Sequence, residues 1–284
     1  MNQIKRSFVW VMPAFLWLIL WLGLPLLIIL AFSLARREAY GGIQLGLNYR
    51  NYLRAFDSLY LVIYFRSVAL SALTTLFCMI VAFPVAYFIA LQRSSLTKNL
   101  LLFLVTLPFW TSFLIRTYAW IIILRAEGLV NSQLMEWGII STPLNLLYNN
   151  FAILVGLVYG ELPFMILPLY TVLERMNKSL LEAAADLGCS PFKTFWRVLV
   201  PLSRSGIWAG TVLVFIPSLG AFVTPDLLGG AKSMMIGNLI QSQFAIVRDQ
   251  PFGSAVAILL TAVILILLAV SYKSTKRGAE VRVI

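Results

Sequence analysis

Six long apolar stretches constrain this chain more than any other feature of its sequence. They cover approximately residues 8–34, 65–91, 100–124, 150–173, 205–228 and 253–272. An apolar run of about 20 residues spans a hydrocarbon core of about 30 Å as an α-helix. Only 12% of the residues are charged, whereas soluble domains carry about 25%. The sequence therefore predicts an all-α integral membrane protein with six transmembrane helices.

The first stretch exceeds the apolar core of a signal peptide, which is about 7–15 residues long, and it lacks a small-residue cleavage site. We expect it to be an uncleaved span. The fifth stretch is interrupted by four residues that disfavour a regular helix: Pro217, Gly220, Thr224 and Pro225. Neighbouring helices must satisfy the backbone groups that such residues free. We therefore expect the fifth span to be kinked and central in the bundle.

Basic residues in the loops set the orientation, because they accumulate on the cytoplasmic side. A cytoplasmic N-terminus places 13 basic residues inside and eight outside, with Arg116 inside the third span. The arginine-rich stretch 36–54 argues the other way. An N-in, C-in topology is the better fit, and it places the polar loop 174–204 in the cytoplasm.

Residues 48–64 combine aromatic and aliphatic side chains at helical spacing with two arginines. They are Tyr49, Tyr52, Leu53 and Phe56, beside Arg50 and Arg54. This pattern favours an interfacial helix on the outer surface. A plain connecting loop is the alternative.

The chain contains no histidine. This excludes His-ligated metals, Ser-His and Cys-His nucleophile pairs and histidine proton relays, and it argues against an enzyme within the membrane. Cys78 lies in an apolar run and Cys189 in a polar loop, so we expect free thiols. The net charge of +11 would suggest nucleic acid in a soluble protein, but here the basic residues lie in membrane loops.

The most polar segment between two spans has an ordered motif. Residues 181–201 read LEAAADLGCSPFKTFWRVLVP. Ser179 to Glu182 has the spacing of a capping box, and Gly188 is a natural left-handed helix terminator. Ser190 and Pro191 restart a helix as cap and first-turn residue. We expect a short helix, a sharp turn and a second helix that leads into the fifth span.

This motif resembles the EAA loop of ABC-importer permeases, in which E-A-A, three residues, G, nine residues and I-x-L-P follow one another. Val198 and Val200 replace the isoleucine and leucine. The resemblance implies the type I importer permease fold. It also implies that the short helix, with Glu182, Ala183, Ala184 and Gly188, docks in a groove of an ATPase subunit.

The same resemblance implies the partners of this chain: two ATP-binding subunits, a second permease subunit, a periplasmic solute-binding protein and membrane lipid, with no nucleic acid. The chain itself has no nucleotide site, because Gly229 to Ser233 does not fit G-x-x-x-x-G-K-[ST]. We therefore expect no enzyme activity and no cofactor in this chain, with ATP and Mg²⁺ bound by the partner ATPase.

Four further segments resemble the spermidine/putrescine branch of this superfamily: 107–120, 156–170, 215–230 and 236–255. The resemblance implies a polyamine as solute. Permeases for opines, amino-acid-like solutes, phosphonates, iron or thiamine share parts of the pattern and stay as alternatives. A stand-alone secondary transporter would predict internal inverted repeats and more ionisable residues deep in the spans.

Polar and aromatic residues within the spans are candidates for the substrate path. Glu161 lies near the middle of the fourth span, where it could meet an ammonium group or pair with Arg116. Aromatic faces for cation–π contact could come from Trp110, Tyr118 and Tyr159, and lipid-facing aromatics are the alternative. Ser218 and Asp226 complete the candidates, the first at the irregular backbone of the fifth span and the second at its outer end.

The predicted domain organisation has three parts. Residues 1–64 form a transmembrane helix with a periplasmic or interfacial segment, and residues 65–272 form the permease domain with the EAA loop at about 174–204. Residues 273–284 form a cytoplasmic tail.

Overall fold

The computed structural model describes residues 2–38, 42–44, 46–177, 179–230 and 232–280, with side chains for all of these except 2–11, 14 and 270–280. Within these ranges the regular elements are helices, apart from one short antiparallel pair of strands. The end of the predicted tail, 281–284, and Ala231 of the segment 229–233 lie outside the described residues.

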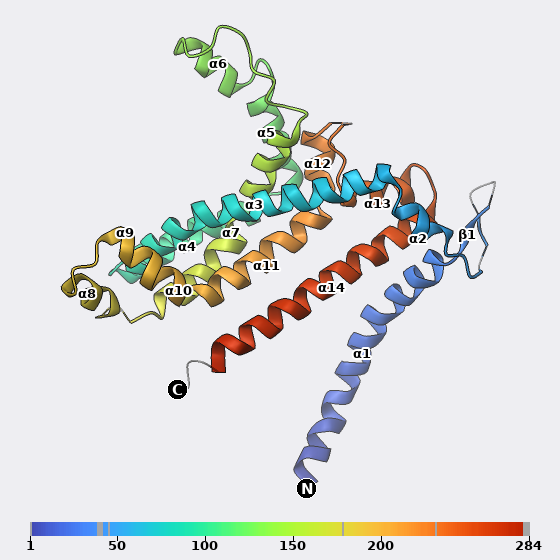
Figure 1. The fold of residues 1–284 in the computed structure, drawn as a ribbon, viewed down its shortest axis with the longest axis horizontal. Coiled ribbons are helices and arrows are strands. Elements are labelled where there is room, and N and C mark those ends of the chain that lie inside the picture. The colour runs from blue at the N-terminus through green and yellow to red at the C-terminus, as the bar shows by residue number, and fades with distance from the viewer. Residues whose placement is uncertain (1, 39–41, 45, 178, 231, 281–284) are drawn as a thin grey trace. The chain divides into compact units, whose positions relative to one another are not determined.

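The helices are shown in Figure 1. In chain order they are α1 (Asn2–Ser33), α2 (Arg50–Ala55), α3 (Ser58–Leu91), α4 (Ser95–Thr106), η1 (Leu107–Trp110), α5 (Phe113–Leu124), α6 (Leu129–Glu136), α7 (Asn150–Glu174), α8 (Ser179–Asp186), α9 (Pro191–Thr194), η2 (Phe195–Leu199), α10 (Val200–Leu202), α11 (Arg204–Gly220), α12 (Val223–Leu228), α13 (Ile236–Ala245) and α14 (Gln250–Glu280). The strands are β1 (Arg36–Arg37) and β2 (Ile43–Gln44). The chain divides into two compact units, one of residues 1–62 and 239–265 and the other of 63–238 and 266–284.

Four described helices are long and apolar enough to cross a membrane. They are residues 15–33 of α1, the whole of α3 and α7, and residues 250–269 of α14. These agree with the first, second, fourth and sixth apolar stretches of the sequence. Two further pairs of helical segments, 95–110 with 113–136 and 191–202 with 204–220, are long and apolar enough only when each bent pair is taken together. The structure then has up to six spans among the described residues.

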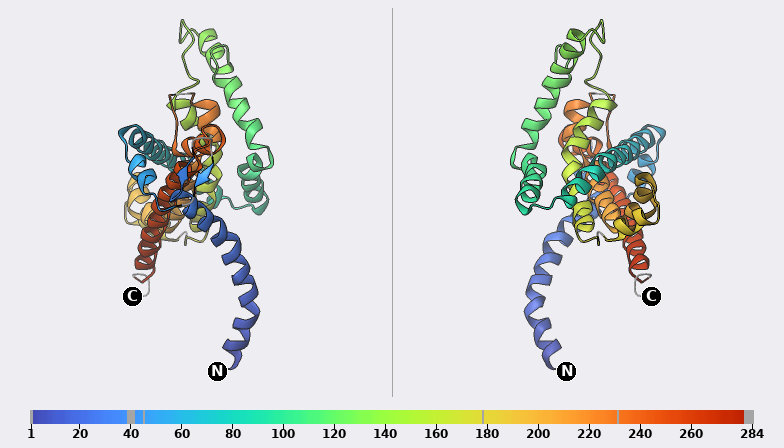
Figure 2. Two further views of the ribbon diagram at one scale, coloured as in Figure 1. Left: turned by 90° about the vertical axis from the view of Figure 1, so that its right-hand side faces the viewer. Right: turned by 90° about the vertical axis from the view of Figure 1, so that its left-hand side faces the viewer.

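The third stretch is not the continuous helix that its composition suggests. It consists of two helical segments, 95–110 and 113–136, whose axes are bent by 90° relative to each other. Figure 2 shows this turn between α4 and α5. Pro108 lies in the single turn of 3₁₀-helix that ends α4, and Thr111 is extended with ψ 146°. Proline lacks the N–H that would continue the α-helical ladder, so the helix tightens and stops there.

The fifth stretch is interrupted after Gly220, and a sharp bend lies just before it. Residues 191–202 and 204–220 meet at 70°, so the sharp bend lies at Ser203, before the predicted span begins. Pro217 is accommodated inside α11, which runs to Gly220. The backbone then becomes extended at Ala221 before α12.

The core of the larger unit is built on α7 and α11, which run side by side (Figure 1). Two glycines on α11 allow this approach. A Cβ at Gly206 would lie 2.9 Å from the backbone oxygen of Pro168, and one at Gly210 would lie 2.5 Å from Met165 Sδ. Around this contact α3 adds apolar side chains, so the buried cluster includes Phe83, Met165 and Val214.

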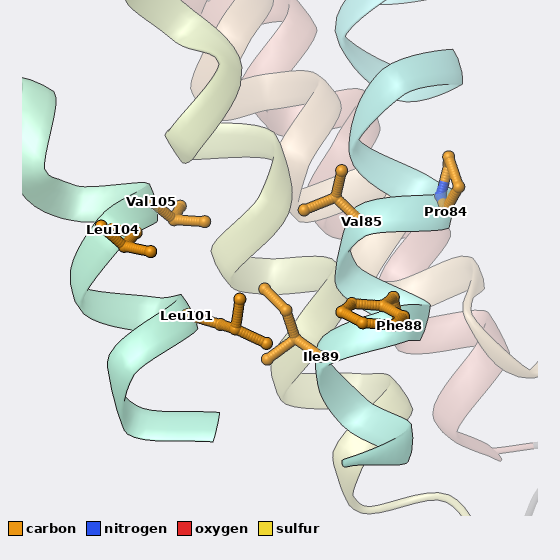
Figure 3. Close-up of a pocket in the computed structure, with 7 residues that line it drawn as sticks. All are labelled: Pro84, Val85, Phe88, Ile89, Leu101, Leu104 and Val105. Carbon is orange, nitrogen blue, oxygen red and sulfur yellow. The ribbon is translucent and has the colours of Figure 1, made fainter. Parts of the chain in front are cut away.

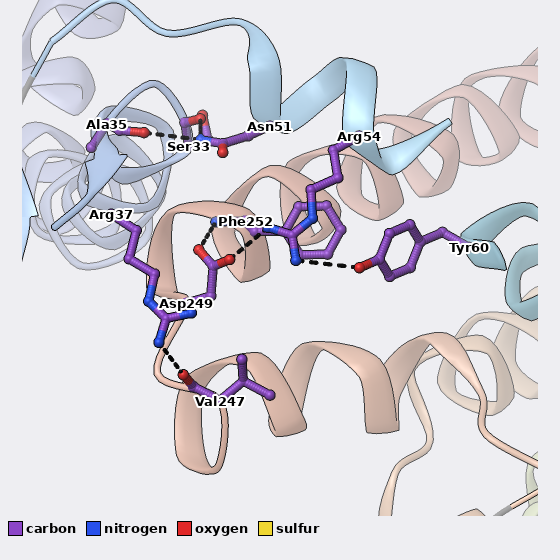
Figure 4. Close-up of polar contacts among 9 residues, drawn as sticks. All are labelled: Ser33, Ala35, Arg37, Asn51, Arg54, Tyr60, Val247, Asp249 and Phe252. Atoms are coloured by element: carbon purple, nitrogen blue, oxygen red, sulfur yellow. Dashed lines mark hydrogen bonds and ion pairs between the residues drawn. The ribbon is translucent and has the colours of Figure 1, made fainter. Parts of the chain in front are cut away.

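The smaller unit is held by polar contacts that involve α2 (Figure 4). Nδ2 of the buried Asn51 donates to Ser33 O at 3.0 Å and to Ala35 O at 2.9 Å. The opposite side of α2 leaves Leu53 and Phe56 exposed. The interfacial helix expected over 48–64 is therefore two helices, because α2 ends at Ala55 and α3 begins at Ser58.

Candidate functional site

The EAA-like loop folds into a compact structure that we call the elbow, residues 179–202. Its first helix, α8, ends in a Schellman motif. The N–H of Gly188 donates to Ala185 O at 2.9 Å, and the N–H of Cys189 donates to Ala184 O at 3.0 Å. Gly188 has φ +74°, the left-handed conformation that this motif requires. The predicted terminator is confirmed at the predicted residue.

The beginning of α8 differs from the capping box expected at Ser179. Ser179 is the first residue of the helix, and its N–H donates to Oδ1 of Asn177 at 3.1 Å. In the expected box that N–H would have been taken by the Glu182 side chain. The cap therefore comes from Asn177, and the Glu182 side chain stays exposed. Ala183 is exposed beside it, whereas Ala184 is buried.

The second arm of the elbow begins as the sequence predicts. Ser190 is the N-cap, with its Oγ accepting the N–H of Lys193 at 3.4 Å, and Pro191 occupies the first turn. The arm then widens into a π-helical turn at 195–199, where the N–H of Val200 donates to Phe195 O. Pro201 follows directly, and its ring would collide with the carbonyl of residue 197 in a regular α-helix. The wider turn removes that collision.

The elbow presents large apolar side chains without covering them. Leu187 is 84% exposed, and Phe192 and Trp196 are also exposed. Soluble surfaces rarely leave several such residues uncovered together, so this face is suited to contact with another surface.

Among the candidate path residues, Glu161 lies on α7 and its possible partner Arg116 on α5, and each has side-chain atoms that are buried. Oε2 of Glu161 is buried without a hydrogen-bond partner, and so are Nε and Nη1 of Arg116. The two side chains do not form an ion pair within 4 Å among the described residues. The guanidinium also lies 5.7 Å from the ring centre of Phe113. Glu161 and Arg116 are thus not directly bonded to each other.

The aromatic candidates have different surroundings. Tyr159 packs edge-to-face on Trp120 with ring centres 5.6 Å apart, which joins α7 to α5. Trp110 is 80% exposed beside the bend of the third stretch, and Tyr118 is exposed on α5. Ser218 is fully buried with an unpartnered Oγ, whereas Asp226 is exposed on α12. Of the aromatic candidates, Tyr159 is the one whose ring pair ties two helices together.

Sequence reasoning missed a polar stripe on α3. Ser71, Thr74, Thr75 and Cys78 are buried there, and Ser71 Oγ and Thr74 Oγ1 have no hydrogen-bond partner. Cys78 Sγ donates to Val158 O at 3.6 Å, three residues before Glu161. The i, i+3, i+4, i+7 spacing of these small polar residues was the available signal. The contact of Cys78 thus places one end of the stripe against the part of α7 that carries the carboxylate.

A cavity of about 450 Å³ between α3 and α4 offers no such chemistry. Its lining side chains, among them Phe88, Ile89 and Leu101, are all apolar (Figure 3). It is suited to an acyl chain and not to a charged solute. Among the described residues there is also no cluster of three or more metal-ligating side chains.

Comparison with known proteins identifies relatives along most of the chain. Residues 82–279 match the family described as binding-protein-dependent transport system inner membrane component. The spermidine/putrescine transport system permease protein PotB of Haemophilus influenzae is 42% identical over 262 residues, which are 92% of this chain and 91% of that protein. The protein of the same name in Escherichia coli K12 is 41% identical over 260 residues, 92% of this chain and 94% of that protein.

A solved structure is similar in fold. It is a chain of a bacterial alginate ABC transporter in complex with an alginate pentasaccharide-bound periplasmic protein. The TM-score is 0.77, with 17% sequence identity over 97% of this chain and 96% of that chain. At this identity the similarity speaks for the fold alone.

Proposed function

The chain belongs to the family of binding-protein-dependent transport system inner membrane components, and on that premise we propose that it forms part of a polyamine path, for putrescine or spermidine, in an ABC importer. It is a multi-pass inner-membrane permease subunit with the type I permease fold. The observation that carries the polyamine assignment is the identity above 40% to two spermidine/putrescine permeases over 92% of the chain.

The buried carboxylate of Glu161 supports a cationic solute. An ionised group in a membrane span is costly unless it meets an opposite charge. Here Oε2 of Glu161 and Nε and Nη1 of Arg116 are buried without hydrogen-bond partners, so Arg116 does not supply that contact. An ammonium group that passes along α7 would supply the missing partner. Tyr159, Trp110 and Tyr118 would offer cation–π contacts worth about 0.5–2 kcal/mol each. Ser218 and Asp226 would add polar contacts along the same route.

The elbow supports an external ATPase as the motor. Its exposed apolar face, with Leu187 and Phe192, would dock in a groove of the ATP-binding subunit. Glu182, Ala183 and Ala184 lie on the first arm, and Gly188 fixes the turn between the arms. Two such subunits would bind ATP and Mg²⁺. A second permease subunit would complete the path, and a periplasmic binding protein would deliver the solute.

The mechanism follows from these parts. ATP closes the ATPase dimer and draws the elbows of the two permeases together. Because each elbow is stiff, its movement reaches α11 and the helices packed on it, and the permeases turn from inward-facing to outward-facing. The binding protein then releases the polyamine into the open path, and hydrolysis resets the assembly.

Uptake by the assembled importer tests the solute. Vesicles that contain the permease pair, the ATPase and the binding protein are supplied with labelled putrescine, labelled spermidine or an unrelated labelled solute. We expect ATP-dependent uptake of a polyamine only, and a loss of about tenfold or more in Glu161→Gln. If no polyamine enters or competes, the solute assignment is wrong, while the family stands.

A second arm of the experiment tests the motor. The chain alone is placed in liposomes without ATP. Accumulation of solute under those conditions would show a stand-alone transporter and contradict the proposed dependence on a partner ATPase. Retention of the ATPase by the wild-type chain during purification, and its loss when Glu182 and Gly188 are altered, is the expected result.

A further inference from the structure

A second cavity lies at the foot of the elbow, away from the residues of the proposed path. It has a volume of about 360 Å³ and is formed by the end of α7, the beginning of α8 and the residues around the bend at Ser203. Its lining combines apolar residues with five polar ones: Thr171, Arg175, Asn177, Ser203 and Ser205. This separates it from the apolar cavity in Figure 3.

The polar lining offers hydrogen-bond donors and no carboxylate. Arg175 provides a guanidinium, and the two serines provide hydroxyls. The Oδ1 atom of Asn177 already accepts the N–H of Ser179, which leaves the amide NH₂ as the free end of that side chain. The neighbouring acid, Glu174, is engaged by Lys98 Nζ at 2.8 Å. A cavity with these donors and a cation favours an anion.

Ser203 gives an independent indication of a ligand. The residue is 0% exposed, it lines the cavity, and its Oγ has no hydrogen-bond partner. A buried hydroxyl without a partner costs about 1–3 kcal/mol. An acceptor in the cavity would remove that cost.

The N-terminus of α11, which begins directly after Ser203, also favours an anion in this cavity. Ser203 immediately precedes the 17-residue α11, and its side chain does not cap that helix. The first N–H groups of a helix have no partner within it and carry partial positive charge. Anions with several acceptor oxygens bind well at such ends. Ser205, in the first turn, lines the cavity too.

We propose that this cavity binds a phosphate group through Arg175, Ser203, Ser205 and Asn177. The group is either free phosphate or the headgroup of an anionic phospholipid, since the recognising chemistry is the same. Arg175 follows the last residue of α7, whereas Ser203 and Ser205 lie at the start of α11. A phosphate held between them joins the ends of the two packed helices at the 70° bend and stabilises that bend.

The test uses the full chain purified in detergent and freed of lipid. Inorganic phosphate and a short-chain phosphatidic acid are each titrated while the melting temperature is recorded, with chloride at matched ionic strength as reference. We expect at least one of the two to raise the melting temperature. A response to phosphate alone identifies the free anion, and a response to the lipid alone identifies a headgroup.

Variants decide whether the ligand occupies this cavity. Arg175→Gln and Ser203→Ala are each expected to weaken binding about tenfold. Arg93→Gln removes an exposed arginine from the loop between α3 and α4 and is the matched control, expected to bind as wild type. The proposal is overturned if neither ligand shifts the melting temperature of the wild type. It is equally overturned if Arg175→Gln and Ser203→Ala bind like the wild type, or if Arg93→Gln loses as much affinity as they do. The result does not depend on polyamine transport, so the two proposals fail separately.

Discussion

Arg54 and Asp249 are 195 residues apart in sequence, and Arg54 Nη1 lies 2.7 Å from Asp249 Oδ2. The other carboxylate oxygen of Asp249 accepts the N–H of Phe252 at 3.2 Å and caps α14. The guanidinium carbon also lies 4.1 Å from the ring centre of Phe252 (Figure 4). Burial lowers the pKa of Arg54, whereas the hydrogen bonds to Asp249 and Tyr60 raise it. The hydrogen bonds have the larger combined effect, so the pKa of Arg54 is raised above its ordinary value. The carboxylate of Asp249 thus binds α2 through Arg54 and also caps the N-terminus of α14.

Replacing Arg54 with alanine should destabilise the smaller unit. The side chain of Asp249 is only 5% exposed, so the substitution leaves a buried carboxylate without its cation. We expect a loss of about 2 kcal/mol, because a buried charge loses its partner while the cap to Phe252 remains. Thermal unfolding of the purified chain measures the effect. Arg50→Ala is the control, since Arg50 forms no ion pair among the described residues, and a loss equal to that of Arg54→Ala would refute the importance of the pair.

Gly188→Ala should strain the elbow through the backbone alone. A Cβ at Gly188 would meet nothing within 4 Å, but φ is +74°, where an L-residue costs about 1–2 kcal/mol. We expect polyamine-stimulated ATP hydrolysis by the assembled importer to fall several-fold. Gly160→Ala is a matched control, because a Cβ there also meets nothing within 4 Å and its φ is negative. Equal effects of the two substitutions would contradict a special role for the turn.

Gly206→Ala should separate α7 from α11. The new Cβ would lie 2.9 Å from Pro168 O and 3.2 Å from Leu169 Cα, which are backbone atoms that cannot move aside independently. We expect a destabilisation of about 1–3 kcal/mol, as for overpacked cores. Gly220→Ala, at the end of the same helix, meets nothing within 4 Å and should be close to neutral. Chemical unfolding of both variants in detergent makes the comparison.

The charges of Glu161 and Arg116 should depend on each other. Neutralising either one alone leaves the other buried without compensation, so each single variant, Glu161→Gln or Arg116→Gln, should lower the melting temperature. The double variant should recover part of the loss, because no uncompensated charge remains. A double-mutant cycle on melting temperatures measures the interaction. Additive losses would show that the two groups act independently.

The local parts of the elbow could be predicted because their causes are local. The positions of Gly188, Ser190 and Pro191 determine the Schellman turn and the restart of the helix within a few residues. The cap at Asn177 was missed because two residues, Asn177 and Ser179, both offered a polar side chain at the helix start. A choice between neighbouring caps depends on backbone angles that the sequence does not reveal.

The break in the third stretch could not be predicted from the presence of Pro108 alone. Pro84, Pro163 and Pro168 lie inside continuous helices, whereas Pro108 lies where one ends. Whether a proline bends or breaks a helix depends on the neighbours that satisfy the freed carbonyls, and these come from distant parts of the chain. The same limit applies to Arg54 and Asp249, whose pairing depends on the folding of two segments that composition does not connect.

The bend at Ser203 determines how a displacement of the elbow acts on the span that follows. Because residues 191–202 meet α11 at 70°, a displacement along the axis of 191–202 is directed mostly across the axis of α11 and only slightly along it. A push along residues 191–202 therefore tends to rotate α11 about the bend and not to slide it along its own axis. Since Gly206 and Gly210 hold α11 against α7 at close range, α11 cannot swing without taking α7 with it. The pair then turns as one lever about the bend, and the carboxylate of Glu161 is carried on that lever.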